Sequence, residues 1–428
     1  MKVLVVGSGG REHALVWKIA RSSRVEKIYC APGNAGIAGL AECIDIRPDD
    51  IEKLTDFAFA NRIDLTVIGP EVSLAKGIVD LFESKGLKIF GPVQKAALLE
   101  ASKVFSKEMM IKYNIPTAKS EIFTNSNDAR NFVRIADIPI VIKADGLAAG
   151  KGVMVAATIE EAEKAIGIIM EDKHFGESGN RIIIEECLKG EEVSFMVFTD
   201  GENIVPMVGS QDHKRAYDDD KGDNTGGMGA YSPTPVINKN LSERIIDEVI
   251  RPIISGMAAE GIRYKGVLYA GLMITDQGPK VLEFNVRYGD PETQVILPRL
   301  KEDLVDIMED VVNGRLAVRE LNWDDRACIC VTCASGGYPG KYEKGKLISG
   351  LEKIRDLKDV IVFHAGTIQQ GARIMTNGGR VLGITALGKN IAQAAKRAYQ
   401  AVKEVCFEEM HYRKDIGLRA IEKSIIKE

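Results

Sequence analysis

The N-terminal part of the chain alternates short apolar strands with helical stretches, and this alternation restricts the fold more than any other feature. Strands are predicted at residues 2–6, 27–30, 65–68 and 87–90, and helices are predicted from about residue 11 and over residues 74–85. Parallel strands connected through helices form a doubly wound sheet. We therefore expect an α/β domain with a parallel sheet at the N-terminus.

A glycine turn, Gly7-Ser-Gly-Gly10, links the first predicted strand to the first helix. It differs from a dinucleotide-binding turn, because residue 12 is Glu12 instead of a third glycine and the second strand ends in Cys30-Ala-Pro-Gly33 instead of a ribose-binding acid. A helix N-terminus still offers backbone N–H groups to a single phosphate. The turn therefore predicts a phosphate site with Arg11 and His13 near it, or else a tight turn without a ligand.

A helical stretch carrying Lys103 is predicted to run to about Asn114, and the glycine-rich residues 139–155 follow between two predicted strands. This glycine-rich stretch is not a Walker loop, because Gly146 and Gly150 are one residue too close together. A glycine-rich hairpin can instead close over phosphates as a lid, and Lys143 and Lys151 would supply positive charge to a nucleotide.

Two further stretches suggest ligand contacts. Residues 181–195 predict two strands with a short connection. The backbone of this connection suits an adenine edge, and an acid beyond it suits ribose, although many crossings between domains have the same pattern.

Residues 209–235 predict a long polar loop, and structureless loops longer than about 15 residues are usually functional or disordered. The glycines at 226–229 favour close packing near a ligand.

Residues 281–294 carry a dense set of chemical groups. Glu283 and Asn285 alternate onto one face of a predicted strand and offer two oxygen ligands to a hard divalent cation. Arg287 follows and can hold a carboxylate or a phosphate with two hydrogen bonds. Asp290 is predicted to cap a helix that has Pro291 at its first position. The arrangement suits phosphoryl transfer, and the alternative is a surface charge cluster at a strand end.

Composition excludes several classes of protein. A net charge of -4 without blocks of like charge argues against a nucleic-acid surface. Apolar runs are too short for a signal peptide or a membrane span, so we expect a cytoplasmic protein. The seven cysteines do not suggest a disulfide scaffold, and Cys328, Cys330 and Cys333 lie in a predicted buried strand that favours structural thiols over a metal site.

Five motifs, in order, resemble those of the phosphoribosylamine–glycine ligase family of the ATP-grasp superfamily: residues 7–14, 143–152, 211–215, 224–231 and 287–294. The resemblance continues through residues 337–340, 363–367 and 379–383 and covers essentially the whole chain. Asp223 and Tyr288 depart mildly from the family pattern, in which proline and phenylalanine are common. Residues 269–273 carry no acid, which leaves the ligands of a second metal open.

The resemblance implies an α/β and α+β multidomain chain with four parts. They are a Rossmann-like domain at 1–101, a first ATP-grasp subdomain with the lid at 102–190, a second subdomain with the metal and substrate site at 191–325, and a mixed α/β domain at 326–428. The implied reaction joins glycine to 5-phosphoribosylamine through glycyl phosphate, uses ATP with Mg²⁺ or Mn²⁺, and belongs to de novo purine biosynthesis. Only these small molecules are expected as partners, with no nucleic acid and no membrane, and we expect a monomer.

The resemblance also implies a role for each matching residue. Glu283 and Asn285 are the expected metal ligands. The expected nucleotide contacts are Lys103, Lys143, Gly150, Lys151, Glu185, Glu186, Leu188 and Glu192. Catalytic roles are expected for Lys143, Arg287 and Asp212. Substrates are expected at Gly9, Gly10, Arg11, Glu12, His13, Asp212, Arg287 and Asp290. Asp212 is assigned to the glycine ammonium group on a chemical ground, because a zwitterion needs an acid as well as Arg287. Two alternatives stay open, namely another ATP-grasp ligase or carboxylase, and a non-catalytic nucleotide-binding protein.

Overall fold

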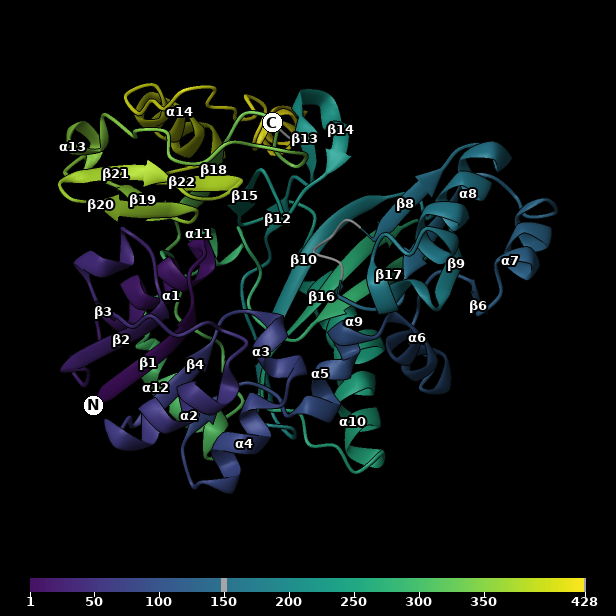
Figure 1. Cartoon of the computed structure of the whole chain (residues 1–428), viewed down its shortest axis with the longest axis horizontal. Coiled ribbons are helices and arrows are strands. Elements are labelled where there is room, and N and C mark those ends of the chain that lie inside the picture. The colour runs from purple at the N-terminus through teal and green to yellow at the C-terminus, as the bar shows by residue number, and fades with distance from the viewer. Residues whose placement is uncertain (148–151, 427–428) are drawn as a thin grey trace.

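The N-terminal residues form a five-stranded parallel sheet in the order β3-β2-β1-β4-β5 (Figure 1). The structure is a computed structural model that describes residues 1–147 and 152–426. The strands are β1 (Lys2–Gly7), β2 (Lys27–Pro32), β3 (Glu42–Cys43), β4 (Leu65–Ile68) and β5 (Ile89–Phe90). Strands are added on both sides of β1, which confirms the predicted doubly wound sheet.

Helices α1 (Gly10–Ile19), α2 (Ile51–Ala60), α3 (Glu71–Ala75) and α4 (Ile78–Ser84) accompany this sheet. Residues Val3–Val6 of β1 are fully buried, as expected for a central parallel strand covered on both faces. The single helix predicted over 74–85 is wrong. Gly77 has φ +85 and separates α3 from α4, because this left-handed conformation cannot continue a right-handed helix.

Helices α5 (Gln94–Ala101) and α6 (Lys103–Lys112) lead to a second, antiparallel sheet. The predicted continuous helix is interrupted at Ser102, whose hydroxyl caps α6 by accepting from the Phe105 N–H. The second sheet, called the lid sheet below, has the order β6-β9-β7-β8. Its strands are β6 (Ser120–Phe123), β7 (Ile140–Ala144), β8 (Val153–Ala156) and β9 (Ile182–Glu186), and its helices are α7 (Ser126–Val133) and α8 (Ile159–Ile166), which a π-helical segment at Gly167–Glu171 extends.

A third sheet, called the central sheet, is antiparallel with the order β11-β10-β16-β17. Its strands are β10 (Glu191–Thr199), β11 (Ile204–Pro206), β16 (Gly266–Thr275) and β17 (Gly278–Asn285). The nearby helices are α9 (Lys239–Ile245), α10 (Arg251–Ala259), α11 (Thr293–Ile296) and α12 (Leu304–Val312), and a π-helical segment at Ile246–Ile250 joins α9 to α10.

The C-terminal sheet has the order β12-β15-β18-β22-β19. Its strands are β12 (Gln211–Asp212), β15 (Gly229–Ser232), β18 (Ala327–Ala334), β19 (Val360–His364) and β22 (Arg380–Gly388). Two hairpins, β13 (Arg215–Tyr217) with β14 (Lys221–Asn224) and β20 (Thr367–Gln370) with β21 (Arg373–Thr376), and helices α13 (Leu351–Ile354), α14 (Ile391–Val402) and α15 (Leu418–Ile426) complete this part.

The structure corrects the prediction of a structureless loop at 209–235. Residues in this stretch form β12 to β15, and Tyr231 of β15 pairs with Ile329 of β18. The C-terminal sheet therefore takes strands from both sides of residue 326. We retain the divisions after residues 101, 190 and 325 as a proposal, with β12 and β15 assigned to the C-terminal sheet.

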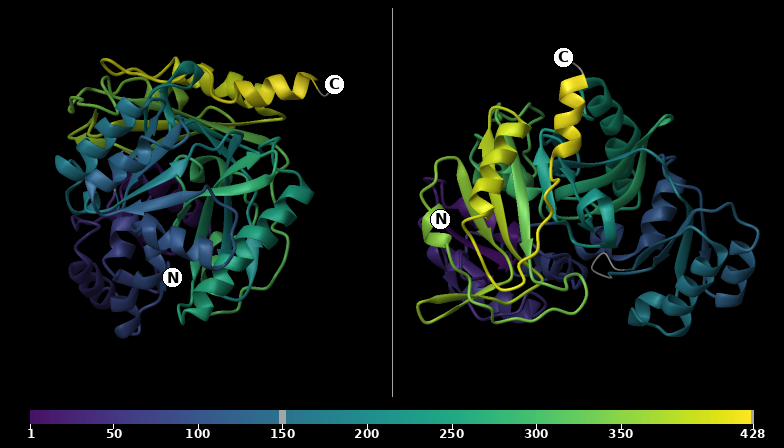
Figure 2. Two further views of the ribbon diagram at one scale, coloured as in Figure 1. Left: turned by 90° about the vertical axis from the view of Figure 1, so that its right-hand side faces the viewer. Right: turned by 90° about the horizontal axis from the view of Figure 1, so that it is seen from above.

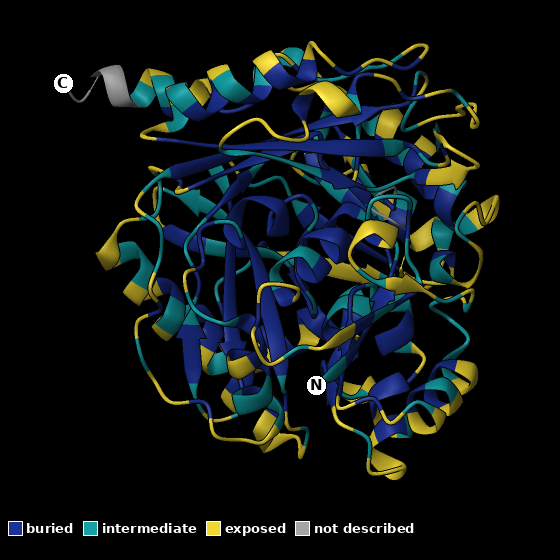
Figure 3. Ribbon diagram, turned by 90° about the vertical axis from the view of Figure 1, so that its left-hand side faces the viewer, coloured by how far each residue is buried: buried dark blue, intermediate teal, exposed yellow. Residues whose placement is uncertain are grey.

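Packing unites three of the sheets. One hydrophobic cluster contains Val5 of β1, Phe198 of β10 and Cys330 of β18. The lid sheet has a separate core that includes Ile142, Ile166 and Ile184, and it lies at one side of the molecule (Figures 1 and 2). Buried strands lie inside and many exposed residues lie on the outer helices and loops (Figure 3). Across the described residues, no helix has the length and apolar character needed to cross a membrane.

Candidate active site

A cavity of about 810 Å³ has walls that come from four parts of the chain. Arg11 of α1, Lys143 of β7, Glu283 of β17 and Arg380 of β22 all line it. This volume is within the range of small-molecule sites. The predicted site residues that line it are Arg11, Lys103, Lys143, Glu185, Glu186, Leu188, Glu192, Asp212, Glu283, Asn285, Arg287 and Asp290. Gly9, Gly10, Glu12 and His13 are not among the lining residues, and Gly150 and Lys151 lie outside the described residues.

The two expected metal ligands stand two residues apart on β17, opposite Gly271 and Tyr269 of β16. Both line the cavity. Burial favours a neutral Glu283, but Lys214 and Lys143 outweigh this effect and lower the pKa of Glu283, so its carboxylate is ionised. One ionised carboxylate and one amide oxygen are the donors that Mg²⁺ accepts, and the pair therefore fits a hard divalent cation.

A buried ionic network lies on the lid side. The Lys143 ammonium group is 2.8 Å from Glu185 Oε2 and donates to the Leu282 carbonyl at 3.0 Å. Glu185 Oε1 is 3.0 Å from the ammonium group of Lys107, which also donates to Thr117 Oγ1 at 2.8 Å. Sequence reasoning missed Lys107, since a lysine within a helix is usually solvated. Its place beside Glu185 depends on how α6 packs against β9.

Lys103 connects α6 to the end of β7. Its ammonium group donates to the Gly146 carbonyl at 2.9 Å. Asp145 Oδ1 accepts from the Ser102 hydroxyl at 2.9 Å and from the Val104 N–H at 3.1 Å, so a carboxylate sits at the N-terminus of α6. These contacts hold Lys103 beside Gly146, within the glycine-rich stretch.

Arg287 is held by carboxylates of the protein. Its Nη2 is 2.6 Å from Glu100 Oε1 and donates to Asn285 Oδ1 at 3.1 Å, and its Nε is 3.3 Å from Glu71 Oε2. Burial raises the pKa of Glu100 to about 7, although Arg287 opposes the shift. The expected anion-binding guanidinium is thus paired with acids from α5 and α3 in this structure.

A second cluster of charged side chains surrounds Lys214, which lies between Glu192 and Glu283. Its ammonium group pairs with Glu192 and is 3.7 Å from Glu283 Oε1. Burial raises the pKa of nearby Asp212 well above its usual value, and Lys214 counteracts this shift. Glu292 also lines the cavity and was missed as a site residue. It accepts from the Tyr269 hydroxyl at 2.6 Å and from the Ser194 hydroxyl at 3.1 Å.

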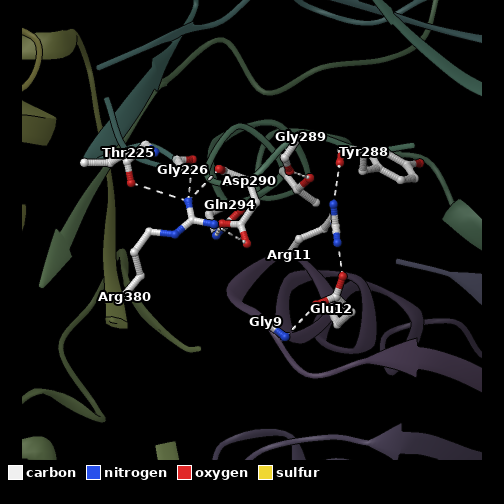
Figure 4. A network of polar contacts seen from close by, with 12 residues as sticks. Gly9, Arg11, Glu12, Thr225, Gly226, Tyr288, Gly289, Asp290, Gln294 and Arg380 are labelled. Carbon is white, nitrogen blue, oxygen red and sulfur yellow. Dashed lines mark hydrogen bonds and ion pairs between the residues drawn. The ribbon is translucent and has the colours of Figure 1, made fainter. Parts of the chain in front are cut away.

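Two carboxylates occupy the N-terminus of α1, where the sequence predicted a phosphate. Glu12 Oε2 accepts from the Gly9 N–H at 2.5 Å (Figure 4). The Asp290 carboxylate accepts from the Arg11 backbone N–H. Glu12 Oε1 is also 2.5 Å from Arg11 Nε. This glycine turn has the glutamate half of a capping box, because Glu12 at the third helical position accepts from the Gly9 N–H while Gly9 has no side chain to form the second hydrogen bond.

The predicted N-cap role of Asp290 is wrong. Helix α11 begins at Thr293 and has Glu292 at its N-cap. The Asp290 carboxylate instead accepts from Gln294 Nε2 at 2.6 Å and lies 3.2 Å from Arg380 Nη2 (Figure 4). The side chain of Asp290 therefore faces Arg380 of β22 and the N-terminus of α1, and it does not cap α11.

His13 points away from the cavity and toward the C-terminal sheet. Its Nδ1 accepts from the His364 backbone N–H at 2.7 Å, and its ring contacts Phe363 edge to face. Burial, reinforced by His364, lowers the pKa of His13 to about 3. The imidazole is therefore neutral near pH 7 and supplies no positive charge to a phosphate.

The fold and the cavity between lid and central sheets define an ATP-grasp protein. The whole chain resembles a biotin carboxylase from Campylobacter jejuni, with a TM-score of 0.75, 14% identity and coverage of 98% of this chain and 94% of that one, a likeness of fold alone. Residues 101–293 match the ATP-grasp (A) domain of phosphoribosylglycinamide synthetase, and residues 1–100 and 328–419 match its N and C domains. The chain belongs to the phosphoribosylglycinamide synthetase family.

Individual relatives agree along the full length. A phosphoribosylamine–glycine ligase of Caldanaerobacter subterraneus subsp. tengcongensis is 51% identical over 417 residues, which cover 97% of this chain and 99% of the relative. The crystal structure of phosphoribosylamine–glycine ligase from Thermotoga maritima has a TM-score of 0.84 and 33% identity, and the match covers 97% of this chain and 100% of that one. The resemblance inferred from the motifs is thereby confirmed.

Proposed function

We propose that this chain joins glycine to 5-phosphoribosylamine with ATP, giving glycinamide ribonucleotide, ADP and phosphate in purine biosynthesis. The observation that carries the proposal is the convergence of the family's motifs on one cavity. Lys143 and Glu185 of the lid sheet, Glu283 of β17 and Arg11 of α1 line the same space. Full-length likeness to phosphoribosylamine–glycine ligases supports the same reaction.

The chemistry proceeds in two displacements. A glycine carboxylate oxygen attacks the γ-phosphorus of ATP and forms glycyl phosphate, while the bond to the β-phosphate oxygen breaks and ADP leaves. The amine nitrogen of phosphoribosylamine then attacks the glycyl carbonyl carbon. Phosphate leaves with the electrons of the carbon–oxygen bond, and the amine loses a proton. No covalent intermediate with the protein is needed, so catalysis depends on positioning and charge stabilisation.

The residues divide between these tasks. We assign Lys103 and Lys143 to the phosphates of the nucleotide, the 185–188 connection to adenine and Glu192 to ribose, and residues from all of these positions line the cavity. Glu283 and Asn285 would hold Mg²⁺, or Mn²⁺ in its place, which offsets phosphate charge. Arg287 and Asp212 are assigned to glycine, and Arg11 with Asp290 to the ribosylamine. For this last substrate the side chain of Arg11 carries the assignment, because Glu12 and Asp290 take the N–H groups of Gly9 and Arg11.

Compartment and assembly form part of the proposal. All seven cysteines are free, which is typical of a reducing compartment, and we assign the chain to the cytoplasm. We also propose a monomer, which sedimentation velocity would test directly.

A coupled assay for ADP tests the function. We expect ADP release only when ATP, glycine and freshly prepared phosphoribosylamine are all present. Bicarbonate in place of glycine serves as a control for carboxylase activity. If the chain bound ATP but released no ADP when glycine was added, the result would instead support a non-catalytic nucleotide-binding protein.

Glu283→Gln tests the assignment of the cation site. The amide keeps the size of the side chain but loses its negative charge, so we expect turnover to fall by orders of magnitude at saturating ATP. The matched control is Glu248→Gln, whose side chain is 37% exposed on the π-helical segment that joins α9 to α10. Wild-type turnover of Glu283→Gln across a magnesium titration would refute the assignment.

A further inference from the structure

Arg380, the first residue of β22, reaches from the C-terminal sheet into the cavity wall. Its Nη1 donates to the Gly226 carbonyl at 2.6 Å and to the Asp290 carbonyl at 2.7 Å, and its Nη2 is 3.2 Å from the Asp290 carboxylate (Figure 4). One planar guanidinium thus joins three segments that are far apart in sequence.

The turn at Gly226 is held from its other side as well. Its N–H donates to the Tyr338 hydroxyl at 3.1 Å, and Tyr338 lines the cavity. A Cβ at Gly226 would lie 3.0 Å from Arg380 Cζ, and a Cβ at Gly227 would lie 2.4 Å from Pro291 Cδ. The turn, the guanidinium and the 290–291 segment are therefore in close contact, and a small displacement of one moves the others.

Asp290 extends this contact to the N-terminal domain. Its carboxylate accepts from the backbone N–H of Arg11, and Arg11 Nη1 donates to the Tyr288 carbonyl at 3.1 Å. Arg380 and Arg11 thereby approach the same short segment, residues 288–290, from opposite sides (Figure 4). The nucleotide assignments lie on other elements, at Lys143 and Glu185 of the lid sheet, Lys103 of α6 and Glu192 of β10.

We propose that Arg380 is a positioning residue for the phosphorylated ribosylamine: it fixes the Gly226 turn and Asp290 against α1 and so sets the KM for that substrate without contacting the nucleotide. The inference rests on the proposed function, because it assigns a role within the same cavity. Displacement of positioning groups by about 1 Å can cost up to a hundredfold in rate, so loss of the guanidinium has a measurable effect.

The test compares Arg380→Met and Arg380→Lys with Arg373→Met, an exposed arginine of β21 in the same part of the chain that does not line the cavity. We expect Arg380→Met to raise the KM for phosphoribosylamine at least roughly tenfold, while the KM values for ATP and glycine stay within about twofold of wild type. Arg380→Lys should restore part of the loss, since lysine keeps the charge but lacks the planar fork. Arg373→Met should match wild type.

Tyr338→Phe is a second variant that keeps the ring and removes one hydroxyl. It should raise the KM for phosphoribosylamine in the same direction and by less, with the melting temperature and the affinity for MgADP unchanged. An unchanged KM for phosphoribosylamine in Arg380→Met, or equal rises in the KM values for ATP and phosphoribosylamine, would overturn the inference. If the wild-type enzyme released no ADP in response to phosphoribosylamine, that result would overturn the proposed function itself.

Discussion

Replacement of Glu185 by glutamine should destabilise the lid sheet more than any loss of a surface ion pair. The carboxylate lies on β9 with both oxygens engaged, 3.0 Å from the Lys107 ammonium group and 2.8 Å from that of Lys143. The side chains of Lys107, Lys143 and Glu185 are 2%, 9% and 4% exposed, so water can replace little of the lost interaction.

The magnitude follows from what the substitution leaves behind. Removing one partner of a buried ion pair costs about 3–5 kcal/mol, because the other charge stays buried without compensation. Glu185→Gln leaves two ammonium groups beside one amide oxygen, so we expect about 3 kcal/mol or more. Lys107→Met leaves Glu185 paired with Lys143 and should cost less, about 1–2 kcal/mol. The double variant should cost less than the sum of the two, since both changes act on one network.

Hydrogen exchange of the β9 amides provides the assay. A chain with several sheets and separate cores need not unfold in one step, so a single unfolding midpoint can miss a local change. Denaturant titration followed by circular dichroism supplements the exchange data. Lys112→Met is the control, because Lys112 lies on the same helix α6 but its side chain is 59% exposed and pairs with Glu260.

The reasoning would be refuted by protection of β9 in Glu185→Gln within about 1 kcal/mol of wild type, or by strictly additive losses in the double variant. Kinetics provide an independent check. Lys143 loses one of its two anchors in Glu185→Gln, so the KM for ATP should rise even at temperatures where the variant is folded.

Two further predictions concern acid stability and the cavity wall. Burial, followed by the effect of His364, lowers the pKa of His13 from 6.5 to about 3, so between these values the unfolded chain binds a proton that the folded chain does not. Folding stability therefore decreases as the pH falls through this window, and His13→Asn, whose side-chain oxygen can still accept from the His364 N–H, should remove a slope of about 1.4 kcal/mol per pH unit. Thermal melts between about pH 4.5 and 7 would show this as a flatter dependence, and an unchanged slope would contradict it. Gly227→Ala should lower both the melting temperature and the affinity for phosphoribosylamine, because Gly227 has φ +114 and a Cβ would lie 2.4 Å from Pro291 Cδ. Gly371→Ala, at φ +59 with open space around the Cβ, is the control, and equal losses in the two variants would show that backbone strain alone is responsible.

Sequence patterns predicted the elements that local chemistry determines. The strand predicted at residues 65–68 coincides with β4, since a short apolar run determines a buried strand wherever it pairs. The failures share a different cause. Strand β15 is short and lies in a polar stretch of the sequence. It forms because Tyr231 pairs with Ile329, almost a hundred residues later in the chain. No local pattern encodes that pairing.

The site shows the same division between local and distant information. Spacing along one strand placed Glu283 and Asn285 together, and the structure brings both to the cavity. Lys107 and Arg380 could not be found this way, because their partners Glu185 and Asp290 come from other elements. Glu12 did give a local signal: a glutamate three residues after the helix cap Gly9 can accept from the Gly9 N–H, and it then competes with a phosphate for that group.

The charges around the cavity connect these contacts to the binding of anionic substrates. Among the described lining residues there are ten carboxylates and nine lysine or arginine side chains, so the walls alone present little net positive field to a triphosphate. A phosphate that enters the cavity must therefore bring its own counter-cation, or it must displace a protein carboxylate from a lysine or arginine side chain.

Two ion pairs of the cavity differ in how easily they can be separated. Lys143 and Glu185 are 9% and 4% exposed and form a buried pair, whereas Lys214 and Glu192 are 29% and 33% exposed. The second pair is the easier one to separate, because its partners can be solvated while they exchange. Its separation would release Glu192 toward the ribose hydroxyls assigned to it, while Lys214 would stay 3.7 Å from Glu283 Oε1 and keep a carboxylate beside its charge.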